Sequence, residues 1–331
     1  MSNQENVTYD FRKSTIPKKH SVGFHITLFL ITLVTTLIAG MFWTTGSAGP
    51  YDIQDFSKGL PYALSILFIL TCHEFGHYFA AKYHKIDVTL PYYIPFPPLP
   101  FFLNFGTMGA VIRTRQVVGN NKAMFDIGVS GPIAGFIASL IVLIYGFTHL
   151  PGIEYILNIH PDYLTTEYGK NAISFEFGDT LLFAALRNLL TNPDQFVPPM
   201  NEIYHYPYLC VGWFGLFITA MNMIPVGQLD GGHIIYSMFG EKIQEAVSGI
   251  SLIALSLLGF IGLLDSILEI GLDFGWSGWL FWALILFFII KIKHPPVYDF
   301  RKLDNFRMIL GYVSIIILLL SFSPAPFIAS L

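Results

Sequence analysis

The chain has 331 residues, of which 53% are hydrophobic and only 12% are charged, and its formal net charge is −4. Because a soluble domain usually carries about 25% charged residues, this composition argues against an ordinary soluble domain and indicates a chain that folds in lipid. The slightly acidic balance gives no indication of nucleic-acid binding. The two cysteines, Cys72 and Cys210, lie in apolar runs and follow no disulfide pattern, and we expect them to be reduced thiols that serve in packing.

Seven apolar runs follow one another along the chain, and a helix needs roughly 17–25 such residues to cross a bilayer. We therefore predict an all-α polytopic membrane protein with about seven transmembrane helices. The polar residues 1–21 are predicted to form a cytoplasmic tail, and the first run is too long to be the apolar part of a cleavable signal peptide. The predicted spans are 22–43, 60–84, 123–149, 207–238, 247–268, 276–292 and 307–328.

The basic residues form three clusters that fall on one side of the membrane if seven spans alternate. The positive-inside rule then places the N-terminus and the loop 86–122 in the cytoplasm, and the loop 150–206 and the C-terminus outside. For a bacterial chain, the membrane would be the cytoplasmic one. The clusters are Arg12, Lys13, Lys18 and Lys19; Lys82, Lys85, Arg113, Arg115 and Lys122; and Lys291, Lys293, Arg301, Lys302 and Arg307.

Two loops contain predicted local structure. The Pro/aromatic run Pro91–Pro100 cannot form a regular helix, because proline lacks a backbone N–H and breaks helix interiors. A short strand-like segment follows at Gly106–Arg113, with an ordinary turn-rich connector as the alternative. In the loop 150–206, Leu181–Leu190 is predicted to form a short helix on the membrane surface.

The second predicted span contains the segment His73-Glu74-Phe75-Gly76-His77. Positions i and i+4 of a helix share a face, so His73 and His77 can grip one metal ion while Glu74 reaches a water bound to it. These are the two zinc ligands and the general base of an H-E-x-x-H motif. Because a charged side chain at the centre of a membrane helix costs about 2.5–3.5 kcal/mol, the three groups together indicate a function rather than packing.

Catalytic zinc normally has three protein ligands and one open position, so a third ligand is required. The acidic candidates inside other spans are Asp126 and Asp230. His73 and His77 lie about 11 and 7 residues before the end of their span and Asp230 about 8 before the end of its own, so at about 1.5 Å per residue their depths match. Asp126 lies at the membrane rim. We therefore predict Asp230 as the third ligand.

The residues around Asp230 suggest a broken helix. Pro225 precedes it by about one turn and cannot donate a helical hydrogen bond. Asn222 is then a candidate donor to the oxyanion that forms when water attacks a peptide carbonyl, with a helix-packing amide as the alternative. His84 and His233 are interpreted as interfacial polar side chains, and support for the metal ligands is the alternative.

Together these motifs resemble the site-2 proteases, a family of intramembrane zinc metalloproteases. The resemblance covers about residues 60–240. It rests on three elements: the H-E-x-x-H segment at residues 73–77, a turn with the pattern Gly131-Pro132-x-Ala134-Gly135, and a helix with the pattern Asn222-x-x-Pro225-x-x-x-Leu229-Asp230-Gly231. It implies a three-helix catalytic core, Zn²⁺ held by two histidines and one aspartate, a glutamate as general base, and cleavage of a substrate's transmembrane segment near the cytoplasmic side.

The same resemblance implies a membrane-associated strand between the first two core helices, which Gly106–Arg113 fits. An exposed strand edge can hold a substrate backbone in extended form. The candidate substrate-binding residues are Gly106, Thr107, Met108, Gly109 and Pro225. The expected partners are a single-span membrane-protein substrate and the lipid bilayer. With no PDZ-sized insertion and no nucleotide-sensing tail, the chain resembles the compact bacterial and plastid-type members.

On this interpretation the chain divides into a tail (1–21), a first span (22–43), a catalytic membrane core (60–240) and C-terminal spans (241–331). A divalent-metal transporter with an intramembrane His/Asp site is the main alternative, and an inactive scaffold is another. A transporter would more often show inverted repeats, which we do not find. The intact His-Glu-His-Asp set argues against a scaffold. We therefore predict a zinc metalloprotease that works in the membrane.

Overall fold

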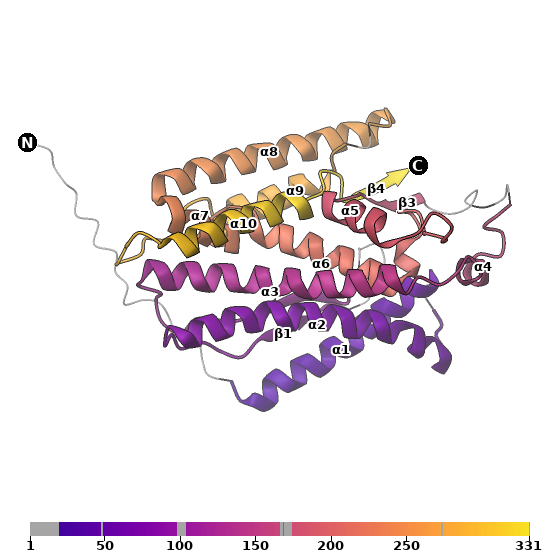
Figure 1. The fold of residues 1–331 in the computed structure, drawn as a ribbon, viewed down its shortest axis with the longest axis horizontal. Helices are drawn as coiled ribbons and strands as arrows, with labels where there is room; N and C mark the ends of the chain where they lie inside the picture. The colour runs from indigo at the N-terminus through magenta and orange to yellow at the C-terminus, as the bar shows by residue number, and fades with distance from the viewer. Residues whose placement is uncertain are drawn as a thin grey trace, which may run out of the picture.

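The computed structural model describes residues 20–330 apart from 48, 98–103, 166–167, 169–173 and 273. The basic tail residues 12, 13, 18 and 19 and the prolines 98 and 100 of the Pro/aromatic run therefore lie outside the described residues. Helices make up most of the molecule and lie side by side (Figure 1). They are α1 (Val22–Thr45), α2 (Ile53–Tyr83), α3 (Asn121–Thr148), α4 (Glu154–Ile159), α5 (Leu181–Leu190), α6 (Pro207–Met223), α7 (Asp230–Phe239), α8 (Glu241–Leu268), α9 (Gly278–Ile285) and α10 (Asn305–Ser321), with a 3₁₀ turn η2 (Ile203–His205) and a π-helical turn η3 (Leu286–Ile290).

Among the described helices, α1, α2, α3 and α8 are long and apolar enough to cross a membrane, whereas α6, α10 and α9 with η3 are shorter apolar helices. Each predicted span is thus mainly helical, which confirms the all-α polytopic class. The predicted short helix at Leu181–Leu190 forms as α5. The last span ends at Ser321 rather than near residue 328, because two prolines follow and the chain continues as a strand.

The fourth predicted span is not one continuous helix. It ends as α6 at Met223 and resumes as α7 at Asp230. Pro225 has no N–H to donate, and Gly227 adopts a left-handed φ of 52°. The six residues 224–229, which lie between the two helices, therefore cannot continue the helix. The sequence predicted a break at Pro225 but not that the following residues would start a separate helix.

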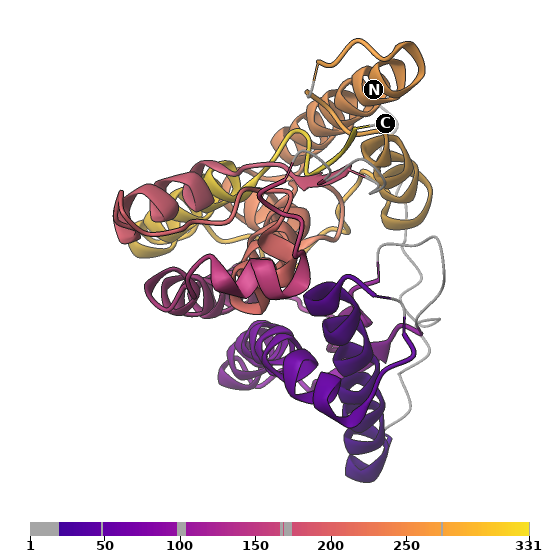
Figure 2. The same cartoon turned by 90° about the vertical axis from the view of Figure 1, so that its right-hand side faces the viewer.

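The helices are stacked in the order α1, α2, α3 and α6, with α8 on the far side (Figure 2). The backbones of α1 and α2 approach closely, since a Cβ added at Gly40 would lie 2.5 Å from the carbonyl oxygen of Gly59. Small residues of this kind allow membrane helices to pack without an intervening side chain. The main core lies between α2, α3 and α6 and includes the fully buried Trp213 and Phe214.

Two small antiparallel strand pairs complete the fold. β1 (Tyr92–Pro95) pairs with β2 (Thr107–Val111), and β3 (Ser174–Phe177) pairs with β4 (Phe327–Ser330). β2 confirms the predicted strand, whereas its partner β1, in the Pro/aromatic run, was not predicted.

The first strand pair is attached to α1 and α2 by specific hydrogen bonds. Thr35 of α1 donates its hydroxyl to the carbonyl oxygen of Gly106 over 2.6 Å. The indole nitrogen of Trp43 donates to the carbonyl oxygen of Asn104 over 2.8 Å. The hydroxyl groups of Tyr93 in β1 and Thr71 in α2 form a hydrogen bond over 2.8 Å. These bonds fix β2 beside the part of α2 that carries the H-E-x-x-H segment.

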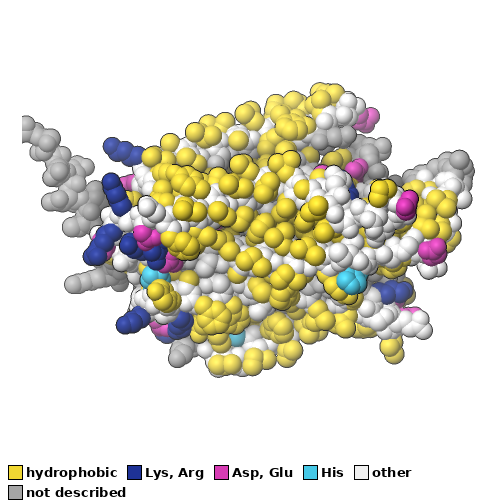
Figure 3. Space-filling model, in the orientation of Figure 1, with side chains coloured by type: hydrophobic (Ala, Val, Ile, Leu, Met, Phe, Trp, Pro, Cys, Tyr) yellow, Lys and Arg dark blue, Asp and Glu magenta, His cyan; other side chains and the backbone are white. Residues whose placement is uncertain are grey.

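The surface shows how the fold relates to a bilayer. Apolar side chains cover the middle of the face in Figure 3, while Lys and Arg side chains gather mainly at the end where α3 begins. Exposed apolar residues occur on several helices and include Leu30, Ile137, Leu257, Phe288 and Leu319. An apolar belt between polar ends fits a membrane protein.

Candidate metal centre

The helix α2 presents the H-E-x-x-H segment inward. It begins with a capping box between Asp52 and Asp55 and continues past Pro61 to Tyr83, so the i, i+4 spacing is kept. His73, Glu74 and His77 are all buried. The Nε2 atoms of the two histidines lie 3.1 Å apart, as expected for side chains one turn apart on one face.

Asp230 reaches the same point from α7. Its Oδ2 atom lies 3.5 Å from Nε2 of His73 and 3.4 Å from Nε2 of His77. Asp230 is the first residue of α7, where the unpaired N–H groups of a helix start favour a negative charge. The interruption of the helix after α6 thus brings the carboxylate of Asp230 to the two imidazoles, although Asp230 lies 153 residues after His77 in sequence.

The separations of these three atoms suit a metal ion. Two ligands that are each about 2.0–2.1 Å from a tetrahedral zinc ion lie roughly 3.3 Å apart. His77 donates from Nδ1 to the carbonyl oxygen of Ile127 over 2.7 Å, which leaves the lone pair of Nε2 directed at Asp230. Fixing an imidazole through its second nitrogen is the usual way to orient a metal ligand. The residues present therefore fit Zn²⁺.

Glycines of α3 make room for both imidazoles. A Cβ at Gly131 would lie 2.1 Å from Nε2 of His77, and a Cβ at Gly135 would lie 3.1 Å from Nδ1 of His73. A Cβ at Gly76 would likewise lie 2.5 Å from the carbonyl oxygen of Ser130, so α2 and α3 are in backbone contact here. The predicted turn at 131–135 is wrong, because α3 continues through it as a helix and its glycines instead form a groove.

A cavity of about 330 Å³ opens at the candidate ligands. Glu74 and Asn222 line it together with the three ligand residues, so the predicted base and the predicted oxyanion donor face the same space. Asn222 lies in the last turn of α6, just before the break. The cavity is also lined by Ala110, Val111, Ile112, Thr114, Ile127, Gln228, Leu229 and His233.

The strand β2 runs along the wall of a second cavity, of about 310 Å³, which shares His73, Glu74 and Asn222 with the first. Three of the predicted substrate-binding residues line it, namely Thr107, Met108 and Gly109. Met108 is 69% exposed. Gly109 has a left-handed φ of 95° and open space around its Cβ position. Among the described residues, β2 pairs with β1 alone, so its other edge has no strand beside it.

The two remaining predicted substrate-binding residues lie elsewhere. Gly106 faces α1, where a Cβ would lie 2.5 Å from the carbonyl oxygen of Thr35. Pro225 lines a separate apolar hollow with Ile234, Phe239 and residues of α8 and α10. Gly106 therefore supports the strand from behind, and Pro225 shapes the break that leads to α7.

The other polar residues considered from the sequence have different surroundings. His84 lies 2.7 Å from Asp126, which also accepts a hydrogen bond from Arg307 of α10 over 2.8 Å. This group lies beyond the end of α2 and not among the candidate ligands. His233 does line the cavity, and its Nδ1 lies 2.6 Å from Nε2 of His294.

Sequence reasoning missed several residues of the site. Val111 and Ile112 line the cavity beside Glu74, although only 106–109 were proposed for substrate contact. The groove-forming role of Gly131 and Gly135 was also missed. Their spacing of one helical turn, with Gly128 one turn earlier, is the small-residue pattern of close helix contacts and was available in the sequence.

The comparison with protein families settles the classification. The model of peptidase family M50 matches residues 61–262. The chain belongs to peptidase family M50. The matched part of this M50 peptidase runs from the first half of α2 into α8 and contains all the candidate ligands. The site-2 protease resemblance drawn from the motifs is thereby confirmed.

The M50 peptidase is also similar to curated plant proteins named probable zinc metalloproteases. It is 27% identical over 277 residues to "Probable zinc metalloprotease EGY2, chloroplastic" of Oryza sativa subsp. indica. The aligned region covers 83% of this chain and 44% of the EGY2 protein. The M50 peptidase is 29% identical over 270 residues to "Probable zinc metalloprotease EGY1, chloroplastic" of Oryza sativa subsp. japonica. That aligned region covers 81% of this chain and 41% of the EGY1 protein. The chain thus spans less than half the length of these relatives. No solved structure matches the chain.

Proposed function

We propose that this M50 peptidase is an intramembrane zinc metalloprotease that hydrolyses a peptide bond in or near the transmembrane segment of a single-span membrane protein. The observation that carries the proposal is the convergence of Nε2 of His73, Nε2 of His77 and Oδ2 of Asp230 within 3.5 Å of one another, with Glu74 on the same cavity. The relatives that are named zinc metalloproteases support the same metal.

In this proposal His73, His77 and Asp230 hold Zn²⁺. When bound, the ion supplies Lewis-acid chemistry that lowers the pKa of a water molecule and polarises a carbonyl. Glu74 faces the cavity and serves as general base, taking the proton from the attacking water and passing it to the leaving amine. The amide of Asn222 donates a hydrogen bond to the oxyanion that develops on the scissile carbonyl.

The free edge of β2 is proposed to hold the substrate. A helical peptide bond is shielded by its own hydrogen bonds, so a transmembrane segment has to become extended before water can attack it. Backbone pairing with β2 would hold it extended along the cavity wall that Thr107, Met108 and Gly109 share with Glu74. Gly106 and Pro225 act indirectly, by fixing the strand and the start of α7.

The membrane arrangement is part of the proposal. The chain is a multi-pass protein of the lipid bilayer, with the N-terminus and the loop 86–122 on the side where the basic clusters gather. Lys82 at the end of α2 and Lys122 at the start of α3 lie at that end of the helices. Since His77 is six residues from the end of α2, cleavage would take place near the same face.

The deciding experiment is reconstitution of the full chain in vesicles with a single-span substrate. Glu74→Gln should lower cleavage by about 10²–10⁴-fold, the range for loss of a general base, while zinc content stays that of the wild type. Glu154→Gln, an exposed acidic residue of α4, should cleave normally. Zinc flux that persists in Glu74→Gln, with no cleavage of any substrate by the wild type, would instead identify a metal transporter.

A further inference from the structure

A second group of metal-ligand side chains lies at the opposite end of the helix stack. Nε2 of His160 is 2.9 Å from Nε2 of His205, and Oε2 of Glu202 is 3.6 Å from Nε2 of His205 and 3.9 Å from Nε2 of His160. His160 follows α4, and the other two residues belong to or adjoin η2. They are brought together although His160 is 45 residues away from His205 in sequence.

This group is remote from the candidate catalytic centre. His205 contacts Thr44 at the end of α1, and Thr44 in turn donates to the carbonyl oxygen of Lys58 at the start of α2 over 3.3 Å. Lys58 precedes His73 by 15 residues, which is roughly 22 Å along a helix at about 1.5 Å per residue. One ion cannot bridge the two groups.

The carboxylate of Glu202 has no hydrogen-bond partner for its inward oxygen. The side chain is 1% exposed, and Oε2 is buried and unpaired among the described residues. Burying a charged group without a partner is costly. A cation between Glu202 and the two histidines would remove this cost.

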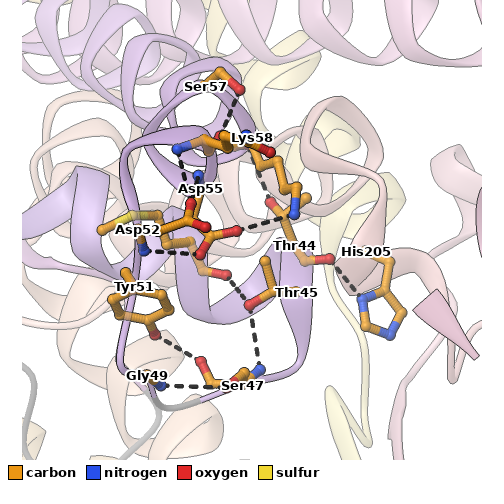
Figure 4. A network of polar contacts seen from close by, with 12 residues as sticks. Thr44, Thr45, Ser47, Gly49, Tyr51, Asp52, Asp55, Ser57, Lys58 and His205 are labelled. Carbon is orange, nitrogen blue, oxygen red and sulfur yellow. Dashed lines mark hydrogen bonds and ion pairs between the residues drawn. The ribbon is translucent and has the colours of Figure 1, made fainter. Parts of the chain in front are cut away.

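His205 is held in the form that binds metals. It is fully buried, and its Nδ1 donates to the carbonyl oxygen of Thr44 over 2.9 Å, as Figure 4 shows. The lone pair of its Nε2 is therefore turned toward His160 and Glu202. Tyr155 donates its hydroxyl to the carbonyl oxygen of His205 over 2.7 Å and fixes the backbone as well.

A plain hydrogen bond between the two imidazoles is the simpler interpretation. With Nδ1 of His205 as donor, Nε2 of His160 would have to carry the shared hydrogen. This arrangement would satisfy the Nε2 atoms of both histidines but would leave the buried oxygen of Glu202 unpaired. The unpaired carboxylate therefore favours a bound cation over a hydrogen-bonded pair.

We propose that His160, Glu202 and His205 form a second metal site that takes a divalent transition-metal ion of the zinc type. Two imidazoles and one carboxylate are a donor set that zinc prefers, and all three ligand atoms lie within 4.8 Å of one another. His160 is 30% exposed, which gives the ion a route from solvent and a place for water as the fourth ligand. A bound ion would link His160, in the loop that follows α4, to Glu202 and His205 at η2. Through the hydrogen bond of His205 to Thr44, it would also link this loop to α1.

Metal analysis of the full-length protein, purified in detergent and dialysed against zinc, tests the proposal. The wild type should retain about two zinc ions per chain, and His160→Asn and Glu202→Gln should each retain about one, since each removes a ligand from a three-ligand site. His149→Asn should retain about two, because His149 is an exposed histidine at the same end of the molecule but outside the group. Asp230→Asn should lose the other ion, so the two sites are counted separately.

A zinc titration in the Asp230→Asn background gives a second readout that does not depend on proteolysis. Added zinc should raise the melting temperature of Asp230→Asn, and the additional change His160→Asn should abolish the rise. Because the His160 side chain is partly exposed, its replacement by asparagine should leave the fold intact, as the elution volume on size exclusion would show. Equal zinc contents in the wild type and His160→Asn, together with no zinc-dependent rise, would overturn the site.

Discussion

Gly131 of α3 faces the imidazole of His77 so closely that a Cβ at this position would lie 2.1 Å from Nε2. Gly131→Ala should therefore push His77 out of its position without changing any charged group. Because a misplacement of about 1 Å can cost about 100-fold in rate, we expect at least that loss of cleavage together with the loss of one zinc ion. Cleavage assays and metal analysis measure the two effects.

A matched control for this substitution lies in α8. Gly249 is also inside a helix, but a Cβ there would have open space around it. Gly249→Ala should leave cleavage and zinc content unchanged and should slightly stabilise the helix, by about 0.5–1 kcal/mol. If Gly131→Ala behaves like Gly249→Ala, the groove in α3 is not what positions His77.

Replacement of Asp230 by asparagine keeps its shape but removes the charge. Since the side chain is proposed as one of three ligands, the affinity of the site for zinc should fall by more than the roughly 10–100-fold seen when only a supporting group is removed. Competition with a chromogenic chelator measures this affinity. Asp87→Asn, at a half-exposed aspartate of the loop after α2, serves as the control and should bind zinc like the wild type. Unchanged affinity in Asp230→Asn would mean that another residue is the third ligand.

Much of the site was predictable from the sequence because its geometry is local. The i, i+4 spacing of His73 and His77 fixes their relation on any helix, and depth in the membrane singled out Asp230. The break between α6 and α7 was only partly predictable, since proline marks where a helix stops but not where the next begins. The pairing of β1 with β2 and the meeting of His160 with His205 depend on distant segments, which no local pattern encodes.

Met108 tests the role of β2 in holding the substrate. Its side chain is 69% exposed and lines the cavity that contains Glu74. Met108→Ser should lower kcat/KM by about 3–10-fold, because part of the 1.5–3 kcal/mol gained by burying such a side chain against the substrate is lost. Zinc content should not change. Val117→Ser alters another half-exposed apolar residue of the same loop that does not line the cavity, and should cleave normally. Equal effects of the two substitutions would argue against substrate contact at β2.

The ion pair between Asp126 and Arg307 should stabilise the packing of α3 against α10. Two nitrogens of Arg307 donate to the two oxygens of Asp126, over 2.8 and 2.6 Å, and both side chains are largely buried. Asp126→Ala should lower the free energy of unfolding by about 1.5–3 kcal/mol, the range for hydrogen bonds to charged groups. Thermal melting in detergent measures this loss.

The control for this loss is the pair of Glu245 with Lys293, whose lysine is 75% exposed. Exposed pairs contribute about 0–1 kcal/mol, so Glu245→Ala should shift the melting temperature little. A small shift for Asp126→Ala as well would show that the ion pair with Arg307 is not what holds α10 against α3.

The edge of β2 that has no strand beside it among the described residues is partly satisfied by the strand itself. The N–H of Gly109 donates to the hydroxyl oxygen of Thr107 over 3.0 Å, and the same hydroxyl lies 3.1 Å from the carbonyl oxygen of Gly109. A substrate that pairs with Gly109 would therefore have to replace the Thr107 hydroxyl. The displaced hydroxyl would then be left at the wall of the cavity that contains Glu74, as a polar group close to the peptide bond that is proposed to be cut.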